Sequence, residues 1–115
     1  MRFDTRELKD YAEPVSMDSL QIGQEYFSVQ YADEAMLIPV VETWVYVGTD
    51  LDKTESGLLY FQDVESYRDG VRYDSTESEG AMFQVGEPGK INHIFEFDHA
   101  LNELLKCSIR RNRSS

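Results

Sequence analysis

The fold is decided by one segment of the chain, Leu37-Ile-Pro-Val-Val-Glu-Thr-Trp-Val-Tyr-Val47. Its many β-branched and aromatic residues predict a β-strand. Because successive side chains of a strand point to opposite faces, one face would carry Val41, Thr43, Val45 and Val47, and the other Val40, Glu42, Trp44 and Tyr46. Both faces are largely apolar, which favours a central strand or one curled inside a small barrel. Pro39 lacks the N–H that a ladder needs and predicts an edge or a bulge near the start of the strand.

The segments around this strand repeat the β pattern. Residues 25–31 alternate strictly between apolar and polar side chains. Further strands are predicted at 58–63, 81–85 and 91–97, with another short one starting at Arg72. The Asp69-Gly70 pair predicts a tight turn between two of them.

Two helices are predicted, one at each end of the chain. Asp4 is a suitable N-cap and Glu7 can complete a capping box, which places the first helix at residues 5–12. Asp98 caps the second helix. Its expected apolar stripe, at helical spacing, consists of Leu101, Leu104, Leu105 and Ile109.

These elements predict a mainly β, α+β fold. We expect a small, strongly curved antiparallel sheet or SH3-like barrel of five to six strands, with a short N-terminal helix and a C-terminal helix. An open sheet with both helices packed on one face is the alternative. The 115 residues suit one globular domain, placed at 1–109, followed by a flexible basic tail at 110–115.

The net charge of −11 is unevenly distributed. Residues 106–115 hold four bases and no acid, whereas the other residues hold seven bases and all 22 acids. A body with a net charge of −15 repels the phosphates of nucleic acids and of anionic membranes, so neither is an expected partner. Another protein with a basic surface is expected instead, although a strong negative charge can also serve solubility alone.

A soluble, cytoplasmic protein is expected from the apolar and cysteine content. The N-terminus has no apolar run that could act as a secretory signal, and the longest apolar stretch, residues 36–41, is too short to span a bilayer. Cys107 is the only cysteine, which excludes a disulfide within the chain and suits a reducing compartment.

No catalytic or phosphate-binding motif stands out, so no catalytic residue, metal or cofactor is assigned. His93 and His99 could supply two zinc ligands, with Glu96 or Asp98 as a third, but their spacing matches no standard site. The carboxylates at 50–55 superficially suggest calcium, yet a glutamate stands where the EF-hand loop requires glycine. Cys107 is predicted late in a helix, where the dipole disfavours a thiolate, so packing is its expected role.

One set of residues remains as a ligand-binding candidate: Glu42, Trp44, Tyr46 and His93. Glu42 interrupts an otherwise apolar strand face, and a carboxyl buried there would be a candidate general acid or ligand contact. The alternative is that this face is open to solvent, or that Arg68 or Arg72 pairs with the carboxylate. An exposed aromatic surface is a related expectation, with Trp44, Tyr26, Tyr46, Tyr60, Tyr67 and Tyr73 as its candidates, unless these rings fill the core.

Three functions follow from these observations. The first is a non-enzymatic protein-interaction module with an acidic and aromatic surface, for example an immunity-type inhibitor of a basic toxin or a nucleic-acid mimic. The second is a small ligand-binding or enzymatic barrel with a pocket near Glu42, Trp44, Tyr46 and His93. The third is a subunit of a homo-oligomer in which the basic tail docks on the acidic body of a neighbouring copy.

Overall fold

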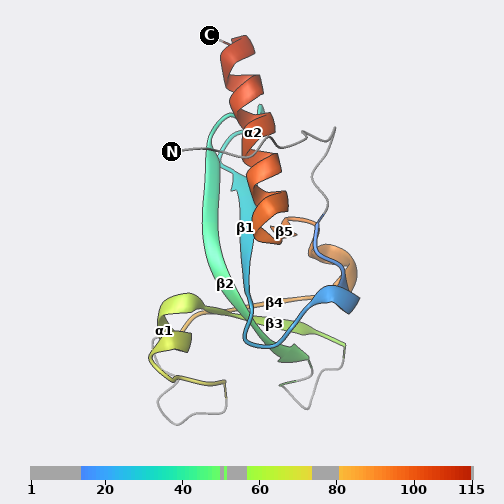
Figure 1. The fold of residues 1–115 in the computed structure, drawn as a ribbon, viewed down its shortest axis with the longest axis vertical. Coiled ribbons are helices and arrows are strands. Elements are labelled where there is room, and N and C mark those ends of the chain that lie inside the picture. The colour runs from blue at the N-terminus through green and yellow to red at the C-terminus, as the bar shows by residue number, and fades with distance from the viewer. Residues whose placement is uncertain (1–13, 50, 52–56, 74–80, 115) are drawn as a thin grey trace, which may run out of the picture.

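The computed structural model of the chain describes residues 14–49, 51, 57–73 and 81–114 (Figure 1). The predicted helix at 5–12 lies outside this part. The elements in chain order are η1 (Met17–Ser19), β1 (Glu25–Tyr31), β2 (Pro39–Thr49), β3 (Leu59–Asp63), α1 (Val64–Arg68), β4 (Phe83–Gly86), η2 (Pro88–Lys90), β5 (Ile94–Phe95) and α2 (Phe97–Ser114).

The strands form one antiparallel sheet of five strands in the order β4-β3-β2-β1-β5. A mainly β fold with an antiparallel sheet and a C-terminal helix is therefore confirmed. The predicted closure into an SH3-like barrel is not confirmed, because β4 and β5 end the strand order and do not pair within the described residues. The strand predicted at 91–97 shrinks to β5, since η2 ends at Lys90 and α2 begins at Phe97. A strand of two residues is too short to pair with both β1 and β4, and the sheet stays open.

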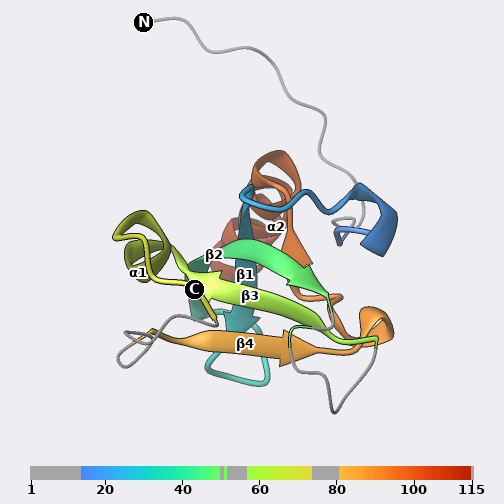
Figure 2. The same cartoon turned by 90° about the horizontal axis from the view of Figure 1, so that it is seen from below.

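Strand β2 belongs to two parts of the molecule. Its residues 39–45 pair with β1, and its residues 44–49, apart from Val47, pair with β3, so that Trp44 and Val45 lie between both neighbours. We call the β1–β2 hairpin up to residue 43 the arm, and β3, β4, α1 and the rest of β2 the body. Figure 1 shows the arm running beside α2, and Figure 2 shows the strands of the body side by side.

The core consists of two clusters that follow this division. The first cluster packs in the body and under the start of the arm, and contains Val15, Tyr26, Trp44, Tyr46, Leu59, Phe61, Ile91 and Ile94. The second lies between the arm and α2, where Val29, Phe95 and Ala100 are buried and Leu104 packs against them. Helix α2 thus covers the face of β1 that carries Val29, while the first half of β2 gains little cover.

Only part of the apolar stripe predicted for helix α2 faces the sheet, where Leu104 packs. Ala100 and Cys107 are buried, whereas Leu105 and Ile109 are exposed. The helix also continues to Ser114, through most of the segment expected to be a flexible tail at 110–115. Its polar contacts with the arm, described below, set this orientation.

The short helix α1 was not evident from the sequence. Asp63 is its N-cap, and the carboxylate accepts hydrogen bonds from the N–H of Ser66 at 3.0 Å and from the N–H of Met82 at 2.8 Å. Burial opposes ionisation of Asp63, but the hydrogen bonds outweigh it and lower the pKa of the carboxyl. At the other end Gly70, with φ of +90°, and Val71 donate to carbonyls of the last turn. The Asp69-Gly70 pair therefore ends a helix in a Schellman motif and does not join two strands.

A bulge in β2 sets the faces of the body. Tyr46 pairs with Phe61 but Gly48 pairs with Tyr60, so Val47 is an extra residue in the ladder. Gly48 has φ of +134°, a conformation that L-residues with a side chain rarely adopt. In a regular strand, residues separated by an odd number of positions point to opposite faces. Because of the extra residue, Tyr46 and Thr49 lie opposite Phe61 and Leu59, and therefore share a face.

Candidate functional site

The structure separates the four residues predicted to bind a ligand. Trp44 and Tyr46 are buried in the first cluster, and the Trp44 Nε1–H donates to Ser28 Oγ at 3.2 Å. Glu42 is exposed on the arm, paired in register with Ser28. These three residues share a strand face, as expected from their alternation, but none of them is part of the lining of the pocket that contains His93, described next.

His93 lines a pocket of about 430 Å³, which we call the histidine pocket. Its walls are mainly apolar, with Phe61, Ile91 and Ile94 supplied by the first cluster. His93 Nε2 lies 3.0 Å from Gln84 Nε2. Because an amide nitrogen can only donate, His93 Nε2 accepts, and the imidazole is neutral with its proton on Nδ1. Burial lowers the pKa of His93, in agreement with this neutral form.

No metal centre is formed by the described residues, because no three side chains of histidine, cysteine, aspartate or glutamate converge there. The carboxylates of the suggested calcium loop, Asp50, Asp52 and Glu55, lie outside the described part of the chain. Cys107 is buried at the arm contact of α2, where its thiol points to the carbonyl of Met36 at 3.5 Å. No hydrogen bond between this thiol and a histidine occurs in the described residues, so a packing role fits its surroundings.

A second pocket of about 430 Å³ lies where η1, the start of β1 and the start of α2 meet. We call it the acidic pocket. Among the residues that the structure describes, its lining carries three carboxylates and no base, and consists of Ser19, Gln21, Gln24, Glu25, Tyr26, Phe27, Glu96, Phe97 and Asp98. Its volume lies within the range of about 300–1,000 Å³ that is common for binding pockets in proteins.

Two features shape the acidic pocket. On one wall, the buried Tyr26 hydroxyl accepts from the N–H of Gln21 at 2.9 Å and holds the turn that precedes β1. On the other wall, Phe97 is 66% exposed although its ring packs edge-to-face on Phe27, with 5.3 Å between centroids. A large aromatic side chain left this exposed beside a rim of carboxylates is a feature of interaction surfaces.

The acidic pocket was not predicted as a site. Its two halves, residues 19–27 and 96–98, are far apart in sequence and meet only because β5 pairs with β1 through Phe27 and Phe95. The signal that could have found it is Phe97 itself, an apolar residue between Glu96 and Asp98 at a helix start. Of the aromatic candidates named from the sequence, Trp44, Tyr26, Tyr46 and Tyr60 are buried, and only Tyr26 lines this pocket.

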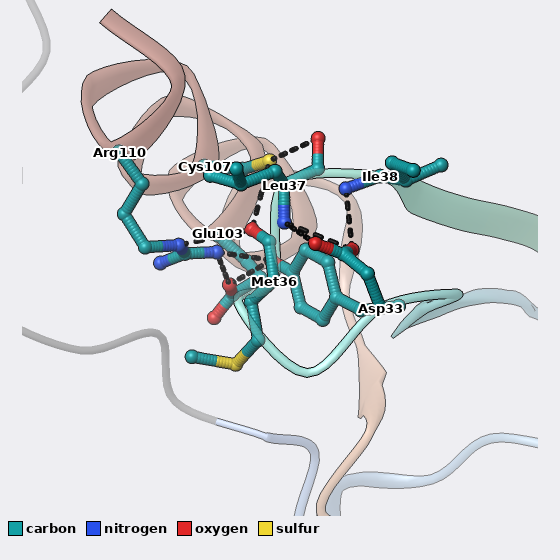
Figure 3. A network of polar contacts seen from close by, with 8 residues as sticks. Asp33, Met36, Leu37, Ile38, Glu103, Cys107 and Arg110 are labelled. Carbon is teal, nitrogen blue, oxygen red and sulfur yellow. Dashed lines mark hydrogen bonds and ion pairs between the residues drawn. The ribbon is translucent and has the colours of Figure 1, made fainter. Parts of the chain in front are cut away.

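The basic end of α2 contacts the tip of the arm (Figure 3). Arg110 Nε donates to the carbonyl of Met36 at 3.1 Å, and Arg111 Nη1 donates to that of Leu37 at 2.9 Å. Arg110 also donates to the Tyr31 hydroxyl at 2.8 Å and forms an ion pair with Glu103. We call these contacts the latch. Arg110 and Arg111 are two of the four bases of the segment 106–115, which was expected to dock on a neighbouring copy, and both are engaged within the chain.

Tyr31 is the half-buried centre of the latch. Its hydroxyl donates to Glu103 and accepts from Arg110. Burial, followed by the hydrogen bond and the negative charge of Glu103, raises the pKa of Tyr31 to about 12. The phenol therefore stays protonated and keeps donating to the carboxylate throughout the physiological pH range.

No family model, curated protein or solved structure matches the chain, so its function must be argued from the pockets and surfaces. Within the described residues, no helix is long and apolar enough to cross a bilayer.

Proposed function

We propose that the protein is a non-enzymatic interaction module that binds a basic segment of another protein at the acidic pocket. The observation that supports this most directly is the combination of Glu25 and Glu96 with the exposed ring of Phe97, in a pocket whose described lining contains no base. An arginine or lysine side chain entering there would meet carboxylates and an aromatic ring at once.

The expected energies limit what the pocket alone can do. An exposed ion pair contributes about 0.2–1 kcal/mol, and a cation–π contact at an exposed site about 0.5–1 kcal/mol. One side chain in the acidic pocket would therefore gain about 1–3 kcal/mol in total, too little for stable binding by itself. The partner must touch a larger surface, and the net charge of −11 would speed its approach if it is basic.

An immunity-type inhibitor of a basic toxin is one concrete form of this proposal. Such a protein needs fast association with a positively charged surface and no chemistry of its own. The acidic pocket would then fix the orientation of the toxin, and the charge of the whole body would supply the steering.

The test uses the full chain, labelled with ¹⁵N, titrated with an arginine-rich peptide and separately with a glutamate-rich peptide of equal length. The arginine-rich peptide should shift the amide resonances of residues 24–27 and 96–98. The double variant Glu25→Gln/Glu96→Gln should bind it about two- to thirtyfold more weakly, since two exposed ion pairs are lost.

The matched control is Glu34→Gln/Glu65→Gln, which changes the net charge equally at two exposed acids outside the pocket. It should lower the affinity less than twofold. If the control variant weakens binding as much as the pocket variant, the affinity for the peptide depends only on the net charge of the protein, and the acidic pocket is not the binding site.

A second candidate function, small-ligand binding, is favoured by the histidine pocket. A neutral imidazole held by Gln84 in an apolar pocket offers the Nδ1–H as a donor for one polar ligand group. Glu42, Trp44 and Tyr46 have no part in this version. A screen of small amides and carboxylic acids by ¹⁵N spectra would test it, and shifts that persist unchanged in His93→Ala would contradict it.

A further inference from the structure

Helix α2 carries an apolar row that the sheet does not cover. Leu101, Leu105 and Ile109 follow one another at steps of four residues, the spacing at which helical side chains lie one above the other. Leu105 is 42% and Ile109 36% exposed, and Leu101 is half-buried. We call these three residues the ridge. The buried residues Ala100 and Cys107 lie on a different side of the helix, so the apolar face of α2 is wider than the part that the sheet uses.

The chain that precedes β1 is fixed close to the start of this helix. The N–H of Val15 donates to the carbonyl of Ile94 at 2.8 Å, and the Val15 side chain is buried in the first cluster. Ile94 belongs to β5, which directly precedes α2 (Figure 1). Pro14 is exposed and is therefore held at the surface near the end of α2 from which the ridge begins.

The residues before Pro14 have the sequence of an amphipathic helix. Leu8, Tyr11 and Ala12 occupy the i, i+3 and i+4 positions of the helix predicted at 5–12, outside the described part of the chain. A helix of two turns is marginal in water by itself, so this apolar row needs a surface on which to pack.

We propose that residues 5–12 form this helix and dock its apolar row on the ridge of the same chain. Because the segment is held at its C-terminal end near the start of α2, it runs antiparallel to α2. The lengths agree, since eight helical residues span about 12 Å and Leu101 lies about 12 Å from Ile109 along the helix. The contact is separate from the binding proposed for the acidic pocket and leaves Phe97 accessible there.

The tether makes this segment the favoured occupant of the ridge. A short linker gives the segment that it carries an effective concentration in the millimolar range, with no partner to recruit. Residues 13 and 14 can bridge up to about 7 Å, and Leu101 lies only about 6 Å beyond Phe97 along α2. In the antiparallel arrangement Tyr11 and Ala12 then lie near Leu101, and Leu8, one turn away, lies near Leu105.

The test is amide hydrogen exchange of the full chain, followed residue by residue in ¹⁵N spectra. In the wild type, the amides of residues 8–12 should exchange at least about fivefold more slowly than in a free peptide of the same sequence. Leu105→Ser/Ile109→Ser should reduce this protection to less than about twofold, because the segment loses its apolar surface. Both side chains are exposed, so the fold should persist, and circular dichroism checks that it does.

The matched control is Ile22→Ser/Met82→Ser. It removes two exposed apolar side chains that do not belong to α2, at 72% and 61% exposure. The amides of residues 8–12 should keep the protection of the wild type in this variant.

The contact can also be tested from the side of the segment. Leu8→Ser/Tyr11→Ser should shift the amide resonances of residues 101–109. Arg6→Ser/Lys9→Ser changes the opposite face of the predicted helix and should leave those resonances in place.

Three results would overturn the inference. The first is exchange of the amides at 8–12 as fast as in the free peptide, and the second is protection that Leu105→Ser/Ile109→Ser leaves intact. The third is protection that rises with the protein concentration, which would assign the ridge to a second copy of the chain.

Discussion

Arg110 Nε donates to the carbonyl of Met36 at 3.1 Å and joins the last turns of α2 to the tip of the arm. Met36 has φ of +58°, a conformation that costs a residue with a side chain about 1–2 kcal/mol. In this conformation the carbonyl of Met36 accepts hydrogen bonds from Arg110 and from the thiol of Cys107. The strained turn and the helix end therefore stabilise each other, since neither contact survives if the other element moves away.

The first prediction concerns Arg110. Replacing it with alanine removes the bonds to Met36 and Tyr31 and the ion pair with Glu103. Because the side chain is partly exposed, we expect the free energy of unfolding to fall by about 1–3 kcal/mol. Urea unfolding followed by circular dichroism measures the change. Arg113→Ala, which affects an exposed base about three turns from Glu103, should stay within about 0.5 kcal/mol of the wild type. Equal losses in the two variants would mean that the latch adds nothing specific.

The second prediction concerns Asp33, which organises the turn of the arm. Its carboxylate accepts from the N–H of Leu37 at 3.0 Å and from the N–H of Ile38 at 2.9 Å. Asp33→Ala should lower the free energy of unfolding by about 1–2 kcal/mol, because both N–H groups lose their partner. Glu34→Ala at the neighbouring exposed position provides the comparison. A destabilisation no larger than that of Glu34→Ala would show that the turn holds without the carboxylate.

The third prediction concerns the ionisation of Tyr31, whose pKa is raised to about 12. A phenol whose pKa is higher in the fold than in the unfolded chain contributes stability that is complete below pH 10 and disappears as the pH rises toward 12. Ultraviolet titration of the tyrosines should show a late step that is missing in Tyr31→Phe. Glu103→Gln should move that step to lower pH, since the negative acceptor is gone. A Tyr31→Phe titration curve that still contains the late step would refute the assignment.

The fourth prediction concerns His93, whose pKa lies below the ordinary 6.5. In this case the unfolded chain binds the proton more readily, so the contribution to stability is present above pH 6.5 and is lost as the pH falls below it. Histidine titrates in the range of about pH 5 to 8. The midpoint of thermal unfolding should therefore fall more between about pH 7.5 and about pH 5.5 for the wild type than for His93→Gln. An equal pH response in the wild type and in His93→Gln would disprove a role for His93.

Much of the sheet could be predicted because its signal is local. The alternation of residues 25–31 gives β1 with the bounds that the structure shows, and the apolar run ending at Val47 gives most of β2. Closure of the sheet could not be predicted in the same way, since it depends on how many residues remain for β5 between Lys90 and Phe97. Helix α1 has too few residues for an apolar stripe, and its stability comes from Asp63 and Ser66.

The candidate site was harder to predict than the fold. Trp44 and Tyr46 were correctly placed on one strand face, but that face is the core of the body and not the wall of a pocket. Whether an aromatic residue is buried or lines a cavity depends on what packs above it, and alternation carries no information about this. The acidic pocket needs the β1–β5 pairing, a contact between residues nearly seventy positions apart, such as Phe27 and Phe95.

The two ends of α2 are held in different ways. Its C-terminal turns are tied to the arm tip through Arg110 and Arg111, while its start follows β5, which pairs with β1, and leaves Phe97 exposed at the acidic pocket. Given the rise of about 1.5 Å for each residue of a helix, about 20 Å separates Phe97 from Arg110 along the axis. The helix thus joins the arm to the rest of the molecule at one end and supplies a wall for a bound protein at the other, and a substitution in one region leaves the second untouched.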